Sequence, residues 1–185
     1  MLLSLLKKRR SIRKFQPVPV ATEKVDQLVE AMLRSPSSRG NNPWEFVVVT
    51  DADQLKRLAR AKEHGSALIE EAPLAIVVCA NPLISDVWIE DCSIAALNIH
   101  LAAASLGLGS CWVQIRKRRH SAELSSCDYV SKLLELPDGY QVEAIIGIGY
   151  PSEEKPSHLR ESLLYDRVSS NRYGIPWTPP DSVAE

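Results

Sequence analysis

The most concentrated chemistry in this 185-residue chain lies near its start, where six of the eight residues from Lys7 to Lys14 are cations. If this segment is extended, alternate side chains point to one face, and Arg9, Ser11 and Arg13 share that face. A hydroxyl between two guanidinium groups suits a phosphate or another oxyanion, because arginine offers a planar fork of donors. A solvated basic arm is the alternative interpretation of the same run.

A second polar cluster runs from Ser35 to Trp44, with the sequence S-P-S-S-R-G-N-N-P-W. It follows a predicted helix and precedes a predicted strand, and its residues up to Asn42 are small, polar or turn-forming. Such a segment is either a capped connection between the two elements or a loop of amide and hydroxyl donors that holds a polar ring system. The sequence leaves both interpretations open.

Familiar catalytic and phosphate-binding motifs are missing from the sequence. G-L-G at residues 107–109 and G-I-G at residues 147–149 both lack the third glycine of a dinucleotide fingerprint, and there is no Walker loop, H-E-x-x-H or G-x-S-x-G. No metal site is expected, since the four histidines are scattered and no cysteines form a C-x-x-C pair. The cysteines are interpreted as reduced thiols of a cytoplasmic protein; they are Cys79, Cys92, Cys111 and Cys127.

The elements that must position these clusters are short. Apolar, β-branched runs predict buried strands at residues 46–50, 75–79 and 144–149. Apolar residues at helical spacing from Val25 to Leu33 predict a helix, with Thr22 as its N-cap. Two further helices are expected, one that begins near Leu55 and one that ends before Pro137.

The segment from Ile94 to Leu106 is apolar on every side of a helix, because ten of its thirteen residues are Ala, Leu or Ile and none is charged. A helix without a polar face must be surrounded by protein. It is therefore either the central helix of the core or a helix with part of its face against a second copy of the chain. We expect both at once, in an obligate homodimer.

Length and composition are those of one ordinary globular domain. The chain is 45% hydrophobic and 24% charged with a net charge of −1, so its global charge favours neither nucleic acid nor membrane as a partner. No apolar run reaches the ~18 residues that a membrane span needs. We expect a single domain over residues 1–175 and an extended C-terminal tail over residues 176–185, which contains a Pro-Trp-Thr-Pro-Pro segment.

Four segments taken together resemble the nitroreductase family of FMN-dependent oxidoreductases. They are R-R-S-I-R-K-F at residues 9–15, S-P-S-S-R-G-N-N-P-W at 35–44, G-L-G-S-C-W-V at 107–113 and G-I-G-Y-P at 147–151. The resemblance extends over residues 6–173. It implies an α+β fold with a central mixed, mostly antiparallel sheet surrounded by helices. It also implies a homodimer with two flavin sites at the subunit interface.

The resemblance assigns flavin contacts by position in the motifs. The residues implied to bind the FMN phosphate and ribityl chain are Arg9, Arg10 and Ser11. The N1/C2-carbonyl edge of the ring is assigned to Arg13. The loop that the other subunit contributes matches Ser37, Ser38, Arg39 and Asn42. The stretch along the N5/O4 side, where a backbone N–H meets N5, matches Val113, Gln114 and Ile115. The phosphate-binding cations near the C-terminus match Arg167 and Arg172.

Two positions depart from the family pattern. His64-Gly65-Ser66 occupies the region where the family often has an Asn that contacts the flavin pyrimidine, and Gln114 stands where many members have Glu. A contact through the Gln114 backbone would tolerate that exchange. The basic run from Arg116 to His120 follows directly and is either a solvated loop or a site that attracts the extra phosphate of NADPH.

The implied activity is hydride transfer from NAD(P)H through flavin N5 to an electron-poor acceptor such as a nitroaromatic, a quinone or an enone. No catalytic side chain is required, since the cofactor performs the chemistry and the protein supplies binding, orientation and electrostatics. Other flavin chemistry on the same fold, reductive dehalogenation or flavin breakdown, is an alternative. A non-enzymatic protein that binds flavin or nucleic acid is another.

Overall fold

The computed structural model describes residues 2–177. Its sheet is formed by four strands, β1 (Trp44–Val49), β2 (Leu74–Ala80), β3 (Gly109–Gln114) and β4 (Gln141–Gly149). They lie in the order β1-β2-β4-β3, and each neighbouring pair is antiparallel. The central strands β2 and β4 are almost entirely buried, whereas β1 and β3 form the edges of the sheet.

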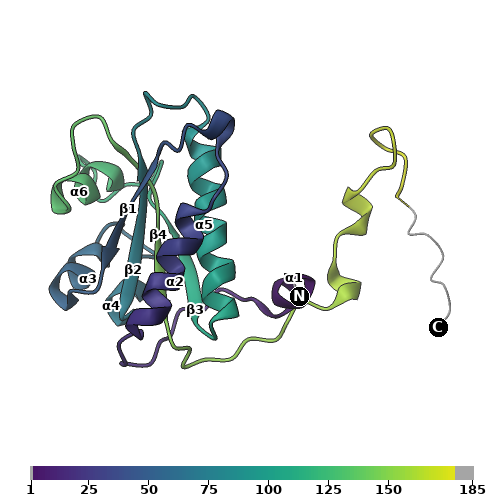
Figure 1. Cartoon of the computed structure of the whole chain (residues 1–185), viewed down its shortest axis with the longest axis horizontal. Helices are drawn as coiled ribbons and strands as arrows, with labels where there is room; N and C mark the ends of the chain where they lie inside the picture. Colours follow the sequence, from purple (N-terminus) through teal and green to yellow (C-terminus); the bar gives the residue numbers. More distant parts are fainter. Residues whose placement is uncertain (1, 178–185) are drawn as a thin grey trace.

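Helices cover both faces of the sheet (Figure 1). On one face, α2 (Thr22–Leu33) and α5 (Trp88–Ser105) pack against each other and against the sheet, where they form the larger core cluster. On the opposite face, α3 (Ala52–Leu58), α4 (Leu68–Glu71) and α6 (Ser126–Leu133) enclose a second cluster. The α+β fold expected from the sequence is confirmed.

The three predicted strands are present as β1, β2 and β4, within two or three residues of the expected ends. The sequence did not predict β3 as a strand. Its sequence, G-S-C-W-V-Q, contains one β-branched residue and no apolar run, so propensity alone gives a weak signal. Pairing with the buried strand β4 over six residues is what makes this segment a strand.

The sheet is more uniform than expected. All three strand pairs of the sheet are antiparallel, where a mixed, mostly antiparallel sheet was expected. Within residues 2–177, the parallel pairing is an isolated bridge between Ser11 and Ser110, where the N-terminal segment meets the outer edge of β3. The parallel pairing therefore lies where the basic N-terminal segment meets β3 rather than inside the core.

The ends of the helices follow local rules in most places. The carboxylate of Asp51 caps α3 by accepting a hydrogen bond from the backbone N–H of Gln54 at 2.8 Å. The prediction that Thr22 caps α2 is wrong by one residue, since Ala21 is the cap and Thr22 is the first helical residue. The helix expected to end before Pro137 is α6, and it ends at Leu133.

Helix α5 is buried on most of its circumference but not on all of it. Cys92, Ala95 and Ile99 face the core and have no exposed surface. The side chains of Ile94 and Leu97 are 39% and 49% exposed within one copy of the chain. The expectation that α5 is a central core helix is confirmed, and one apolar stripe on it remains uncovered.

The two ends of the described chain lie beyond the sheet. Helix α1 (Leu2–Lys8) precedes the basic segment. From Pro151 onward the chain leaves the sheet and continues as an extended arm (residues 152–177), which carries two short 3-10 turns and projects away from the body in Figure 1. Of the predicted tail, Trp177 stacks on Tyr165 of the arm at 5.8 Å between ring centroids. Residues 178–185 lie outside the described residues.

Candidate functional site

The basic N-terminal segment lies along the free edge of β3. The backbone N–H of Ile12 donates to the carbonyl of Ser110 at 3.0 Å, and Ser11 and Ser110 form the parallel bridge. Ile12 is buried, whereas the flanking Arg9, Arg10 and Ser11 are half-buried and Arg13 is exposed. The segment is extended around Ser11, the conformation in which Arg9, Ser11 and Arg13 share one face, and its backbone there pairs with β3.

A glycine on β3 allows this close approach. A Cβ atom built on Gly109 would lie 2.7 Å from the Cβ of Ile12, which is closer than such atoms can approach. The Ile12 side chain therefore seats directly against the backbone of β3. This contact sets how closely the chain around Ile12, with its neighbours Arg9 and Ser11, approaches the edge of the sheet.

The start of the arm holds the basic segment from its other side. The backbone N–H of Arg13 donates to Glu153 Oε1 at 2.6 Å, and Lys155 Nζ donates to the carbonyl of Ser11 at 2.9 Å. Glu153 and Lys155 also pair with each other at 3.1 Å. The hydrogen bond from the Arg13 backbone holds the pKa of Glu153 below its ordinary value. Neither residue was predicted from the sequence, where the signal is an acid and a base two positions apart shortly after the G-I-G-Y-P motif.

A cavity of 260 Å³ opens beside the basic segment. Its cationic lining consists of Lys8, Arg9, Arg10 and Lys155, and Glu153 is the carboxylate among the lining residues. Guanidinium and ammonium donors that converge on one hollow, next to an apolar floor, are a donor set that a phosphate fits. Of the predicted phosphate-binding residues, Arg9 and Arg10 line this cavity, and Ser11 follows them in the chain without lining it.

A buried histidine lies beneath this cavity. His100 on α5 is 6% exposed, and its Nδ1 lies 2.7 Å from the hydroxyl oxygen of Ser110. Its ring stacks on Trp112 with 6.3 Å between centroids. Burial, with a smaller contribution from the Arg9 charge, lowers the pKa of His100 to about 4. His100 is therefore neutral at pH 7 and supports the strand edge without charge.

The predicted N5/O4 stretch is the end of β3. Val113 and Ile115 are buried, so their side chains belong to the core, and the backbone N–H of Ile115 donates to the carbonyl of Glu143. Gln114 is half-buried between them. The side chains of Val113 and Ile115 are thus packing residues, which is consistent with the expected contact through the backbone.

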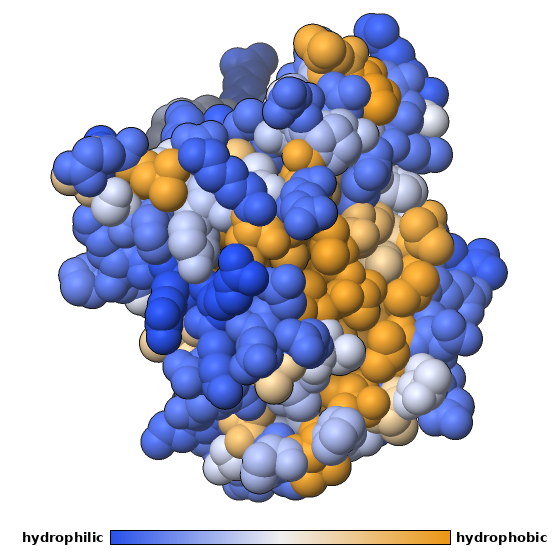
Figure 2. Space-filling view, turned by 90° about the vertical axis from the view of Figure 1, so that its left-hand side faces the viewer, coloured by the Kyte–Doolittle hydropathy of each residue, from blue (hydrophilic) through white to orange (hydrophobic). Residues whose placement is uncertain are grey.

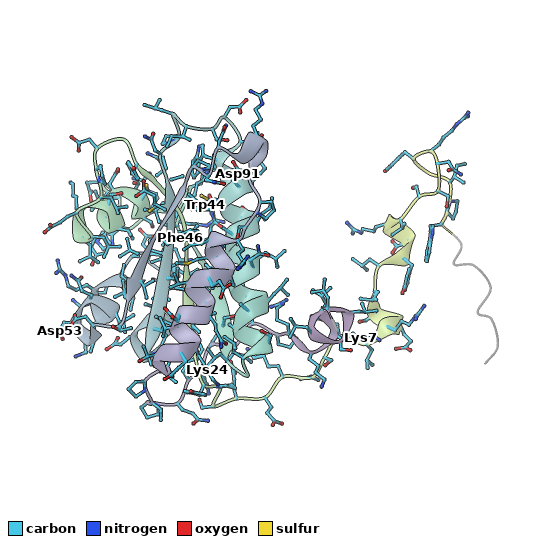
Figure 3. The ribbon with its side chains drawn as sticks, in the orientation of Figure 1. Lys7, Lys24, Trp44, Phe46, Asp53 and Asp91 are labelled. Atoms are coloured by element: carbon cyan, nitrogen blue, oxygen red, sulfur yellow. The ribbon has the colours of Figure 1, made fainter. Side chains whose placement is uncertain are left out.

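The polar loop Ser37–Asn42 lies at the other end of α5 from the basic segment. The backbone N–H of Ser38 donates to Asp91 Oδ1 at 2.8 Å, and Asp91 lies in the first turn of α5. The cavity beside the basic segment reaches Ala104, thirteen residues further along the helix, which at 1.5 Å per residue is about 20 Å away. Figure 3 shows Asp91 and Lys7 far apart in the same way. One copy of the chain does not bring these two predicted clusters together.

Backbone conformation in this loop is unusual for residues that carry side chains. Arg39 and Asn42 adopt φ values of 54° and 46°, the left-handed region that side chains disfavour. The hydroxyl of Ser37 bonds both the backbone N–H and the side-chain Oδ1 of Asn42. Arg39 is thereby held exposed at the tip of a closed loop.

The remaining predicted contacts are placed elsewhere. Arg167 and Arg172 are exposed on the arm, which projects away from the sheet, so one copy does not bring them to the basic segment (Figure 1). Ser66 is buried, and its hydroxyl donates to the carbonyl of Ala59 at 2.7 Å. It is a structural residue of its own loop rather than a free donor.

The basic run after β3 meets a second cationic loop. The backbone N–H of Glu63 donates to the carbonyl of Arg119 at 3.4 Å, and His120 Nδ1 lies 2.7 Å from the carbonyl of Arg60. Burial and the neighbouring Arg118 charge lower the pKa of Lys62. Neither Lys62 nor Arg118 has a carboxylate within 4.0 Å in the described part of the chain.

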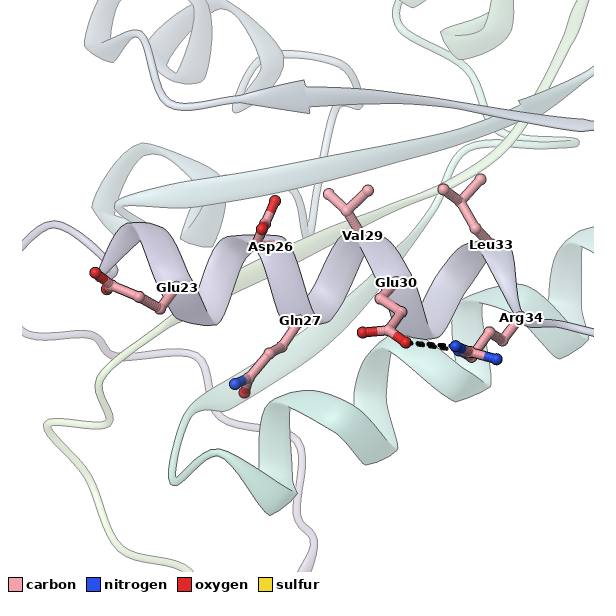
Figure 4. Close-up of a pocket in the computed structure, with 7 residues that line it drawn as sticks. All are labelled: Glu23, Asp26, Gln27, Val29, Glu30, Leu33 and Arg34. Atoms are coloured by element: carbon pink, nitrogen blue, oxygen red, sulfur yellow. Dashed lines mark hydrogen bonds and ion pairs between the residues drawn. The ribbon is translucent and has the colours of Figure 1, made fainter.

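A different hollow, of 590 Å³, lies on the outer face of α2 (Figure 4). Residues of a single helix line it, and the ion pair between Glu30 and Arg34, at 2.7 Å, spans one turn on its rim. A groove on one exposed helix face, with no group from a second element, lacks the converging donors found beside β3. Figure 2, which views the molecule from the left-hand side of Figure 1, shows a band of apolar side chains that runs down that face of the body.

All four cysteines are free thiols, as predicted, and three of them are buried. Burial raises the pKa of Cys79 to about 12, so this thiol is unreactive. In residues 2–177, no group of three or more His, Cys, Asp or Glu side chains is arranged to hold a metal ion. The same residues contain no helix long and apolar enough to cross a bilayer.

The fold and its edge site define a class of protein: an α+β domain in which an N-terminal cationic segment pairs with an edge strand next to a hollow lined by cations. The model of the Nitroreductase family matches residues 6–82 and 60–150 of the chain. The chain belongs to the nitroreductase family.

Similar proteins agree with this assignment. An FMN-dependent nitroreductase from Clostridium difficile R20291 superposes with a TM-score of 0.91 at 45% sequence identity, over 92% of this chain and 99% of that one. An NADPH-flavin oxidoreductase from Vibrio harveyi is 32% identical over 89% of this chain and 71% of its own length. An FMN reductase [NAD(P)H] from Bacillus subtilis is 27% identical over 88% and 72% of the two chains.

Proposed function

We propose that this protein is an FMN-dependent oxidoreductase that passes hydride from NAD(P)H to an electron-poor acceptor such as a nitroaromatic, a quinone or an enone. The observation that carries the proposal is the basic segment paired with the edge of β3, with Arg9 and Arg10 lining a cationic hollow. Family membership and the FMN and NAD(P)H in the names of the relatives support it.

The residues beside β3 would hold the cofactor at its charged end. Arg9, Arg10 and Ser11 would bind the phosphate, and Lys155 adds a fourth donor that the sequence analysis did not include. Arg13 would face the N1/C2-carbonyl edge of the ring. When bound, FMN would supply the hydride-transfer chemistry between NAD(P)H and the acceptor.

The side chains of this chain supply binding and charge rather than acid or base catalysis. His100 is neutral and buried with its Nδ1 at the Ser110 hydroxyl, so it does not offer a proton at pH 7. Arg13 favours negative charge on whatever lies against it, and a charge-assisted hydrogen bond is worth about 1.5–3 kcal/mol. We infer that the role of Arg13 is to stabilise the reduced cofactor more than the oxidised one.

A homodimer would complete the site. The loop with Ser37, Ser38, Arg39 and Asn42 lies about 20 Å from the basic segment along α5, so a second copy is the available source of that loop. Exposed apolar side chains on α5 and on the arm support this assembly, because monomers rarely expose large contiguous apolar patches. They are Ile94, Leu97, Leu159, Leu163, Leu164 and Tyr173. Arg167 and Arg172 would then reach the partner's site from the arm.

The test is cofactor binding followed by turnover. We expect the purified protein to be yellow, to release FMN on denaturation, and to oxidise NAD(P)H only when an acceptor from a nitroaromatic, quinone and enone panel is added. The Arg9→Ala/Arg10→Ala variant should bind FMN at least tenfold more weakly. Arg34→Ala, which removes an exposed arginine on α2, is the matched control. A wild-type protein that is colourless and does not take up added FMN would overturn the proposal.

A further inference from the structure

One residue of β4 holds the end of β3. The register between β2 and β4 shifts at Val78/Cys79, and Glu143 has no partner on β2 at this irregularity. Its backbone carbonyl accepts hydrogen bonds from the N–H groups of both Ile115 and Arg116, each at 3.1 Å. The two residues that follow β3 are therefore anchored to a single carbonyl group.

The side chain of Glu143 continues this anchoring. Glu143 is 4% exposed, and its Oε1 lies 3.2 Å from Nε2 of Gln114. On the other side of the same amide, Oε1 of Gln114 accepts a hydrogen bond from the indole N–H of Trp112 at 2.8 Å. The indole can only donate and the carboxylate can only accept, so the orientation of the amide is determined by its two neighbours.

The other oxygen of Glu143 faces a cation. Its Oε2 is buried without a hydrogen bond and lies 4.0 Å from Nε of Arg116, whose guanidinium is over the Trp88 ring. The thiol of Cys92 on α5 is a titratable group close enough to interact with this carboxylate. Burial raises the pKa of the Cys92 thiol, so the thiol stays neutral. The Glu143 carboxyl group thus lies between one amide and one guanidinium.

We propose that Glu143 is the positioning residue for the end of β3, and that its charge requires an amide at position 114. A carboxylate at 114 would keep the bond from Trp112 but would face Glu143 with no proton between them. Two neighbouring carboxylates with little solvent cannot both ionise without cost. Glutamine at 114 and glutamate at 143 therefore form one coupled unit.

The consequence for the site rests on the proposed function. The segment Val113–Ile115 is the stretch assigned to the N5/O4 side of the flavin, and the Gln114 side chain is already occupied by Trp112 and Glu143. The contact with the cofactor therefore falls to the backbone of this segment. Glu143 controls where that backbone lies without touching the flavin.

A double-mutant cycle tests the coupling. Gln114→Glu, Glu143→Gln and the double exchange are compared with the wild type by urea unfolding of the apoprotein and by FMN dissociation constant, at pH 8 and pH 6. We expect Gln114→Glu to weaken FMN binding about tenfold at pH 8 and less at pH 6, where the two carboxylates share a proton. The double exchange regenerates an amide–carboxylate pair and should recover affinity to within threefold of the wild type at both pH values.

The control and the contrary results are distinct. Gln141→Glu adds the same charge at an exposed position at the start of β4 and should leave both measurements unchanged. The proposal is wrong if the double variant loses as much as the two single variants combined, or if the effect of Gln114→Glu is equal at both pH values. A wild-type protein that binds no FMN would instead count against the proposed function. The urea unfolding midpoints of the apoprotein would still show whether Gln114 and Glu143 are coupled.

Discussion

The imidazole of His100 and the hydroxyl of Ser110 lie 2.7 Å apart in a buried contact that joins α5 to the edge of the sheet. The carbonyl of the same Ser110 accepts the backbone hydrogen bond from Ile12, so the histidine supports the basic segment through one intermediate residue. Burial, with a smaller contribution from the Arg9 charge, lowers the pKa of His100, so it is the neutral imidazole that supports the segment at pH 7.

The first prediction concerns pH. The pKa of His100 is about 4 in the folded protein, against about 6.5 in an unfolded chain. The unfolded chain therefore binds the extra proton first, and the free energy of unfolding should fall as pH drops from 6.5 towards 4, by up to about 3 kcal/mol. Urea unfolding between pH 7 and pH 4.5 measures this slope. His100→Gln should flatten it, and an equal slope in both proteins would contradict the prediction.

The second prediction concerns the flavin potential. Replacing Arg13 by Ala removes a cation from the assigned N1/C2-carbonyl edge, and the midpoint potential should fall by about 30 mV or more, the equivalent of roughly 1.4 kcal/mol for a two-electron couple. FMN should remain bound through Arg9 and Arg10. Redox titration makes the measurement, with the neighbouring exposed Lys14→Ala as a control. An unchanged midpoint potential in the Arg13→Ala variant would contradict the proposal that Arg13 stabilises the reduced flavin.

The third prediction concerns the contact between Gly109 and Ile12, which holds the basic segment against β3. Gly109→Ala would place a Cβ 2.7 Å from that of Ile12 and push the segment outward. We expect a loss of about 1–3 kcal/mol in the free energy of unfolding together with weaker FMN binding. Gly139→Ala is a useful comparison, because Gly139 has a φ of +86° and open space around it. Gly139→Ala should destabilise the protein while leaving FMN affinity intact. The same loss of FMN affinity in both variants would contradict the role of the Gly109–Ile12 contact in FMN binding.

The fourth prediction concerns assembly. A charge at Leu97, which is 49% exposed on α5, would be buried in a homodimer that uses this face, and burying an unpaired charge is costly. Leu97→Glu should therefore shift the protein from dimer to monomer in light scattering and reduce FMN retention. Val18→Glu changes a residue of similar exposure, 47%, outside α5. Wild-type protein that is already monomeric, or a dimeric Leu97→Glu variant, would contradict the prediction.

Much of the body could be predicted from local patterns. The strands at β1, β2 and β4 are short apolar runs, and α5 is apolar almost all round, so their burial follows from composition within a few residues. Alternate spacing singled out Arg9, Ser11 and Arg13 as an anion-binding face, because it is a local signal, and the motif resemblance added Arg10 to the phosphate-binding candidates. Strand β3 was missed, since its residues acquire strand conformation only by pairing with β4.

The amino-acid sequence by itself determined which residues could bind an anion and which segments had to be buried, because charge and hydropathy are properties of single residues and their near neighbours. Tertiary structure decided what surrounds them. Glu153 and Lys155 reach Arg13 and Ser11 across more than 130 residues of chain, and Glu143 meets Gln114 across 29. Contacts between residues so distant in the chain depend on how strands align, and no local pattern encodes that alignment.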